Sequence, residues 1–181
     1  MSSPPSIDLS LTDWLVLAIL CEEPRHGFAV ARELEPASEL GAIWTVRRPL
    51  VYRAIDHLVD LDLVEARSVE PGRQGPHRTV MAPTRSGRAR VSRWLDQPVD
   101  HPRDVRTTLL AKLALRTRRG DVLTPLARAQ LDRINGVRDG VEQKRRQSEG
   151  IDRLTMQWRV SANDAIASFL ETVIADERSG R

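Results

Sequence analysis

Arginine is concentrated between residues 67 and 93, where seven arginines accompany a single acidic residue, Glu70. Residues 1–96 as a whole hold 12 basic and 13 acidic side chains, so the positive charge is local rather than spread along the segment. Contacts between arginine and phosphate supply sequence-independent affinity for nucleic acid. The cluster therefore favours a chain that binds nucleic acid through one limited surface.

A second group of candidate DNA contacts lies at the start of a predicted helix. Arg47, Arg48, Tyr52 and Arg53 fall within seven residues of one another. An arginine in the major groove can span O6 and N7 of guanine with two hydrogen bonds, so Arg53 is the candidate for reading a base. Arg47 and Arg48 are candidate contacts at the same helix start, and Tyr52 can face solvent or a partner.

Catalytic chemistry has little support in the sequence. No glycine-rich phosphate loop, nucleophile elbow or paired acid motif is present, and the one cysteine, Cys21, lies in an apolar helical pattern. We predict a non-enzymatic protein without a metal or cofactor. The histidines lie 20 to 31 residues apart, without metal-ligand spacing: His26, His57, His77 and His101.

Three helices are predicted before the arginine cluster. Ser10 and Asp13 form a variant capping box that opens an apolar helix, and Pro24 must end it. Gly27 then begins a short second helix through about Leu34, and residues 35–48 read as a connector. Pro49 fits the first turn of a third helix, because the missing donor costs nothing there. Apolar spacing places three of its residues toward the core: Val51, Ile55 and Leu58.

A β-hairpin and a fourth helix follow. Residues 63–70 and 78–84 are compatible with two strands joined by a loop with two glycines and two prolines. Arg73, His77 and Arg78 lie on or beside the tip of this loop, where they can reach phosphates. Three helices, a hairpin and a helix form the layout of a winged helix-turn-helix, so residues 1–96 are predicted to be a DNA-binding domain.

Residues 97–181 are predicted to be almost wholly helical, with a break near Gly150. The last helix carries apolar residues on one face over more than six turns: Ile151, Leu154, Trp158, Ala162, Ile166, Phe169 and Val173. A stripe of that length needs a second surface to cover it. A second copy of the chain is the simplest source, which predicts a homodimer, and a helical hairpin on a monomer is the alternative. The overall fold class is mainly α with a small β-hairpin wing and a C-terminal helical dimerisation domain.

Three stretches of the chain resemble the PadR family of bacterial transcriptional regulators: "LTDWLVLAILCEEPRHGFAVARELE", "PLVYRAIDHLVDLDLVE" and "GRQGPHRTVMAPTRSGRARVSRWL". The resemblance covers residues 11–95 and continues into "HPRDVRTTLLAKLAL". It implies a DNA-binding homodimer, usually a repressor, of the longer subgroup with an extended helical C-terminus. It also implies release from DNA by a small aromatic effector, for which Trp158 is the candidate contact and Trp94 and Trp14 are the alternatives.

Two positions depart from the pattern of that family. Phe28 stands where tyrosine is common, and Pro49 stands where serine is common, so two hydroxyl groups are missing. Contact with phosphate is therefore expected to depend more on Tyr52, Arg47 and Arg48. The sequence predicts a cytoplasmic repressor that binds double-stranded DNA and does not associate with a membrane. The alternative is a winged-helix protein-interaction module that lacks sequence-specific DNA binding.

Overall fold

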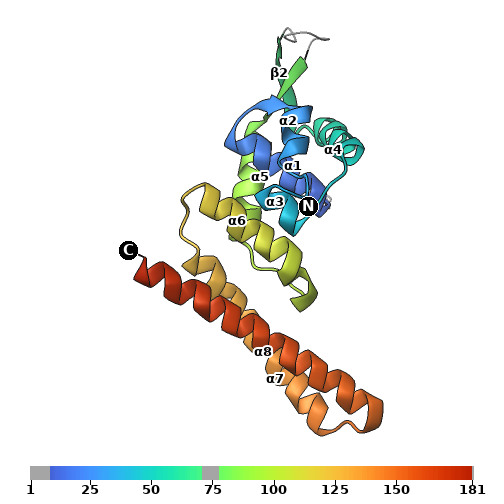
Figure 1. The fold of residues 1–181 in the computed structure, drawn as a ribbon, viewed down its shortest axis with the longest axis vertical. Coiled ribbons are helices and arrows are strands. Elements are labelled where there is room, and N and C mark those ends of the chain that lie inside the picture. The colour runs from blue at the N-terminus through green and yellow to red at the C-terminus, as the bar shows by residue number, and fades with distance from the viewer. Residues whose placement is uncertain (1–8, 71–77, 181) are drawn as a thin grey trace, which may run out of the picture. The chain divides into compact units, whose positions relative to one another are not determined.

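The structure is a computed structural model that describes residues 9–70 and 78–180. The chain divides between Leu95 and Asp96 into two compact units, here called unit 1 (residues 1–95) and unit 2 (residues 96–181). Unit 1 combines helices with a small sheet, and unit 2 is helical throughout its regular elements (Figure 1). The predicted fold class, mainly helical with a small hairpin, is confirmed.

Helix α1, Leu11–Glu22, forms the centre of unit 1. The predicted capping box is present, since the Asp13 amide donates to the Ser10 hydroxyl over 3.2 Å and the Ser10 amide donates to Asp13 Oδ2 over 2.9 Å. The residues from Leu15 to Leu20 are all buried, so α1 is enclosed on every side rather than on one stripe. The helix ends before Pro24, as proline requires.

Helix α2, Gly27–Arg32, is followed by helix α3, Glu39–Ile43, which the sequence had not predicted. The segment was interpreted as a connector because five residues are too few to show a helical period. Ser38 caps α3 by accepting from the Gly41 amide over 3.0 Å. A side chain at Gly41 would lie 1.8 Å from the Glu35 carbonyl oxygen, so the close turn before α3 requires glycine.

Helix α4, Arg48–Asp60, is the predicted third helix, with Pro49 in its first turn. Val51, Ile55 and Leu58 are buried, as predicted. The Arg47 backbone is extended and supplies no side-chain cap, so the basic residues before Pro49 lead directly into the helix. Pro49 therefore located the start of this helix, and apolar spacing located its inner face.

The sheet of unit 1 has three antiparallel strands in the order β1-β3-β2, with β2 at Val64–Glu70 and β3 at Arg78–Pro83. These two strands are the predicted hairpin. The additional strand, β1, is Arg25–His26, in the break between two helices where the sequence predicts no strand. Arg25 pairs with Met81 and His26 with Val80, so the break after α1 is a strand at the edge of the sheet. Such a pairing joins residues far apart in sequence, and no local pattern announces it.

Helix α5, Arg85–Asp96, closes unit 1. Val91, Trp94 and Leu95 are buried, and the Trp94 ring stacks on the Trp14 ring with centroids 5.0 Å apart and planes 4° from parallel. The start of α5 closely approaches the segment between α4 and β2, because a side chain at Gly87 would lie 2.2 Å from the Leu63 carbonyl oxygen. The first and last helices of unit 1 thus meet in one core.

Unit 2 begins with the short helical turns η1, Pro102–Asp104, and η2, Val105–Leu109, which lead into α6, Leu110–Arg118. The sequence predicts a helical segment here, and the structure divides it into a 3₁₀ turn, a π-helical turn and an α-helix. Gly120 ends this part with φ 72°, a conformation suited to glycine.

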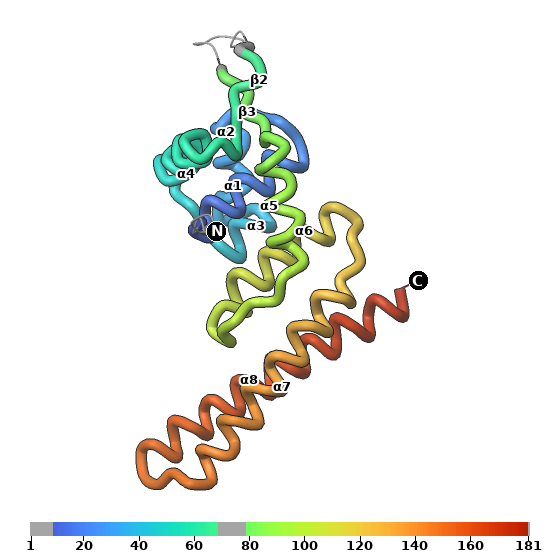
Figure 2. The backbone as a smooth tube through the Cα atoms, turned by 180° about the vertical axis from the view of Figure 1, so that it is seen from behind, coloured from blue at the N-terminus to red at the C-terminus, as the bar shows by residue number. Residues whose placement is uncertain are grey.

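Helices α7, Thr124–Arg146, and α8, Gly150–Ser179, form an antiparallel pair whose chain direction is clear in Figure 2. Leu126, Ile134 and Leu170 belong to the buried core of unit 2. The predicted break near Gly150 is present, and its φ of 53° is again a glycine conformation. No helix in the described part of the chain is long and apolar enough to cross a membrane.

The apolar stripe predicted along α8 divides into two faces. Ile166 and Val173 pack against the core of unit 2, beside the buried Asn163. Leu154 and Asn163 are nine residues apart, about 2.5 turns, so they lie on opposite sides of the helix. We call the uncovered residues the open face of α8: Ile151, Leu154, Trp158 and Phe169, with exposed fractions of 74%, 65%, 72% and 37%.

Candidate nucleic-acid interface

The first turns of α4 present the predicted basic residues to solvent. Arg47, Arg48, Tyr52 and Arg53 are all exposed, and they lie on one helix end because Val51 and Ala54 turn the opposite side into the core. Among the described residues, neither Arg47 nor Arg53 forms an ion pair. The structure therefore brings together four of the seven predicted DNA contacts and leaves their polar groups accessible.

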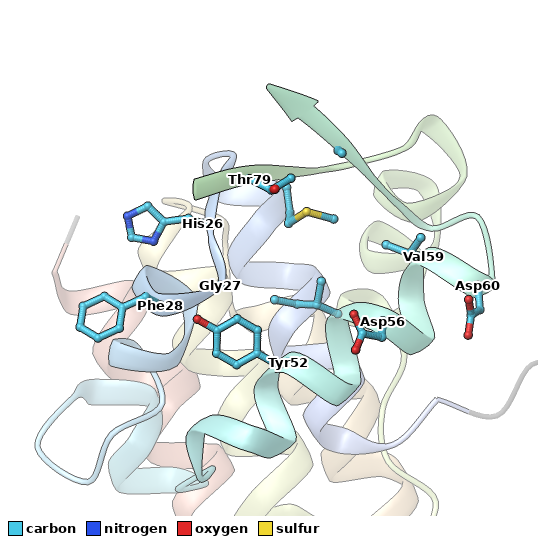
Figure 3. Close-up of a pocket in the computed structure, with 11 residues that line it drawn as sticks. His26, Gly27, Phe28, Tyr52, Asp56, Val59, Asp60 and Thr79 are labelled. Atoms are coloured by element: carbon cyan, nitrogen blue, oxygen red, sulfur yellow. The ribbon is translucent and has the colours of Figure 1, made fainter. Parts of the chain in front are cut away.

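The segment from His26 to Phe28 supports this end of α4. The His26 imidazole Nδ1 accepts from the Ala29 amide over 3.1 Å and so caps α2. Gly27 lies against Tyr52, and a side chain at Gly27 would come within 2.7 Å of Tyr52 Cε1 (Figure 3). His26 is thus a structural residue. Gly27 is required for α2 to approach α4.

Phe28 and Glu35 flank Arg48, and sequence reasoning missed this arrangement. The Arg48 guanidinium carbon lies 4.6 Å from the centre of the Phe28 ring, and a guanidinium nitrogen of Arg48 lies 3.9 Å from Glu35 Oε1. Phe28 is in α2, Glu35 is in the segment that follows α2, and Arg48 is in α4, twenty residues after Phe28. Only a pairing across the fold brings them together, so no local spacing could have indicated it.

A pocket of about 870 Å³ separates α4 from the sheet. Asp56 and Asp60 lie along its α4 wall, as Figure 3 shows. Carboxylates repel phosphate, whereas the arginines at the start of the same helix attract it. The charge of α4 is therefore divided, with basic side chains at its start and carboxylates along the pocket. The remaining lining residues are His26, Gly27, Phe28, Tyr52, Ile55, Val59, Ala66, Thr79 and Met81.

The predicted contacts in the wing lie largely beyond what the structure describes. Arg73 and His77 fall outside the described residues. Arg78 opens β3, and its backbone is in register with Glu70 of β2. The residues between the two described strands are outside the described part of the chain, so the side-chain contacts predicted there stay a prediction.

A side-chain contact that the sequence did not indicate links α4 to α1. His57 Nδ1 lies 3.3 Å from Asp13 Oδ1, and Asp13 is the same residue that closes the capping box. His57 follows Arg53 by one helical turn. The contact therefore connects the outer side of α4 to the start of the central helix.

Comparison with known proteins finds a family match within unit 1. The sequence model of the transcriptional regulator PadR-like family matches residues 16–93, which begin within α1, end within α5 and include α4 and the sheet. Over these residues the chain is similar to PadR-like transcriptional regulators, as the resemblance in its sequence implies.

Several individual proteins are similar to this chain. A probable transcriptional regulator of Mycobacterium tuberculosis, Rv1176c, is 30% identical over 102 residues, which are 56% of this chain and 52% of that protein. The matched segment thus spans about half of this relative. The structure of Bacillus subtilis PadR in complex with operator DNA has 16% identity and a TM-score of 0.48, covering 94% of this chain and 99% of that one. PadR of the same organism in complex with p-coumaric acid has 16% identity and a TM-score of 0.42, covering 98% and 99%.

Trp158, the predicted effector contact, lies in unit 2 at a groove of about 980 Å³. Val137, Val141 and Phe169 give the groove apolar walls, while Arg106 and Arg159 also line it. Asn163 lines the groove as well, is 2% exposed, and its Oδ1 has no hydrogen-bond partner. The groove offers an apolar surface with one buried polar atom and nearby positive charge.

Proposed function

We propose that this chain is a homodimeric transcriptional repressor that binds an inverted-repeat operator. The observation that carries the proposal is the exposed basic group at the start of α4, formed by Arg47, Arg48 and Arg53 with Tyr52. In a helix-turn-helix protein the start of the recognition helix contacts base edges in the major groove. Residues 1–96 are the proposed DNA-binding domain, and a repressor of this kind works in the cytoplasm, where its operator lies.

The open face of α8 supports the homodimer. Leu154 and Trp158 are large apolar residues that nothing in unit 2 covers. Symmetric dimers use the same patch on both subunits, so two open faces can cover each other. Residues 97–181 are therefore the proposed dimerisation domain, and a dimer would present two copies of α4 to two half-sites.

Selection from random DNA tests this function. The full-length protein is incubated with a pool of 30-bp duplexes of random sequence, and the bound fraction is sequenced over successive rounds. We expect enrichment of an inverted repeat whose half-site centres are about 10 bp apart, one turn of B-DNA. A pool that stays random would contradict the proposal and would favour the alternative, a winged-helix module that binds another protein.

The groove at Trp158 supports a second element of the proposal, which is release from DNA by a small aromatic ligand. Apolar and aromatic walls with few polar groups are typical of ligand sites, and the unpartnered Asn163 oxygen can accept one hydrogen bond. The test uses p-coumaric acid as the probe, titrated into the complex with the enriched duplex. We expect dissociation for the wild type and a weaker response for Trp158→Ala. Retention of DNA at saturating probe would contradict release by this ligand.

A further inference from the structure

Arg48 is the one residue of the α4 basic group whose guanidinium is held between two other side chains. The Phe28 ring lies 4.6 Å from its guanidinium carbon, which is within the range of a cation–π interaction. The Glu35 carboxylate lies 3.9 Å away, at the limit of an ion pair. By contrast, Arg47 and Arg53 make no such contact among the described residues.

The contacts of Arg48 with Phe28 and with Glu35 differ in strength, and bound DNA would affect them differently. The Arg48 and Glu35 side chains are 53% and 52% exposed, and exposed ion pairs contribute little because water screens them. A phosphate can replace such a carboxylate, since both are anions that accept from guanidinium. The Phe28 ring holds no charge and leaves the outer edge of the guanidinium free to donate hydrogen bonds.

We propose that Phe28 is a positioning residue that holds Arg48 ready for a DNA phosphate, and that Glu35 occupies the guanidinium until DNA replaces it. The inference rests on the proposed function, because it assigns Arg48 a phosphate contact. Arginine loses rotamer freedom when it is fixed, and a ring that fixes it beforehand lowers that cost on binding. Phe28 stands where a tyrosine hydroxyl was expected to contact DNA directly, and the structure gives the ring itself a role through Arg48.

The test measures the affinity of full-length variants for the duplex that the wild type enriches from the random pool. Phe28→Leu keeps an apolar side chain but removes the aromatic face, and we expect about two- to fivefold weaker binding, the usual range for an exposed cation–π pair. Phe28→Tyr retains the face and is expected to bind at least as tightly as the wild type. Glu35→Gln is expected to bind severalfold more tightly, because the competing carboxylate is removed.

Two controls separate positioning from general effects. In an Arg48→Ala background, Phe28→Leu and Glu35→Gln should each change affinity by less than twofold, since the residue through which they act is absent. Glu39→Gln neutralises another exposed carboxylate, on α3, and controls for the overall change of charge. Circular dichroism of each variant controls for folding.

The outcomes distinguish this inference from the function it depends on. If the wild type enriches no duplex, the proposed function fails and the inference fails with it. If the wild type enriches an operator but Arg48→Ala binds it unchanged, only the inference fails. A loss from Phe28→Leu that persists in the Arg48→Ala background would show that Phe28 acts through packing, which also overturns the positioning role.

Discussion

Unit 1 and unit 2 bury their apolar residues to very different degrees. In unit 1, helix α1 is enclosed by α4, α5 and the sheet, and six consecutive residues from Leu15 to Leu20 are buried. In unit 2, helix α8 buries one side against α7 and leaves Leu154 and Trp158 on the other. A closed core can hold a rigid binding surface on one chain, whereas an open apolar face requires a second molecule. The difference supports the proposal that unit 1 carries recognition and unit 2 carries assembly.

A charged residue on the open face of α8 should disrupt the proposed dimer. Leu154→Asp is expected to raise the dimer dissociation constant by at least about 100-fold, because each protomer loses a buried leucine worth about 1.5–3 kcal/mol and must bury a carboxylate. Sedimentation velocity over a range of protein concentration measures the shift. Gln157→Asp, an exposed position on the same helix but off the open face, is the matched control. An unchanged dimer would show that another surface joins the subunits.

A substitution that creates a cavity in unit 1 should show how far the stability of this unit depends on its closed core. Trp94→Ala removes the ring that stacks on Trp14, and loss of a buried tryptophan lowers the free energy of unfolding by about 3–5 kcal/mol. Hydrogen exchange measured on peptides from residues 9–95 reports the loss. Arg93→Ala, exposed on the same helix, should change stability by no more than about 0.5 kcal/mol. Equal effects from the two variants would contradict a closed core.

A buried lysine gives unit 2 a pH dependence of its own. Burial lowers the pKa of Lys112 from 10.5 to about 8, and its ammonium group donates to the Gln97 carbonyl over 2.6 Å. Between about pH 8 and 10.5 the unfolded chain keeps a proton that the folded chain has lost, so the free energy of unfolding rises with pH.

The rise attributed to Lys112 is up to about 1.4 kcal/mol for each pH unit. Denaturant titrations from pH 7 to 10.5 measure it, and Lys112→Met should remove it. The other lysine of the chain, Lys144, is exposed, and Lys144→Met is the control. A slope that survives in Lys112→Met would assign the pH dependence to another group.

A base contact by Arg53 would make unit 1 the source of sequence specificity. Arg53→Ala is expected to weaken binding to the enriched operator by about 1–3 kcal/mol with a smaller loss on random duplexes, because only the operator offers the matching base. Fluorescence anisotropy with both duplexes at one salt concentration measures the difference. Equal losses on the two would place Arg53 among the phosphate contacts.

Substitutions in the wing should have the smallest effect on binding, and this effect should not depend on the DNA sequence. Arg73→Ala and Arg78→Ala are each expected to weaken binding to all sequences similarly and to reduce the slope of log affinity against log salt by up to about one. Titrations at several salt concentrations on operator and random duplexes test this. Identical slopes in wild type and both variants would remove the wing from the interface.

Local patterns were sufficient for the elements that depend on neighbouring residues. The capping box at Ser10, the start of α4 at Pro49 and its buried residues Val51 and Ile55 follow from spacing and backbone chemistry alone. The same holds for the hairpin, whose turn residues separate two β-compatible runs. These features of the site could be predicted because each is decided within one or two turns of chain.

Features that depend on contacts across the fold could not be predicted in this way. Strand β1 exists because Arg25 and His26 pair with β3, more than fifty residues later. The cation–π contact between Phe28 and Arg48 likewise joins two helices. On α8, helical spacing showed an apolar stripe but could not show that α7 would cover only part of it.

The stack of Trp14 on Trp94 has a consequence for the newly made chain. Because the two rings are eighty residues apart, the core of unit 1 cannot be completed until α5 has left the ribosome. An interval follows in which the residues of the open face, between Ile151 and Phe169, are still to be made. During that interval a finished unit 1 is still tethered to a ribosome and has no open face with which to pair. Synthesis therefore separates in time the formation of the proposed DNA-binding surface from the formation of the dimer.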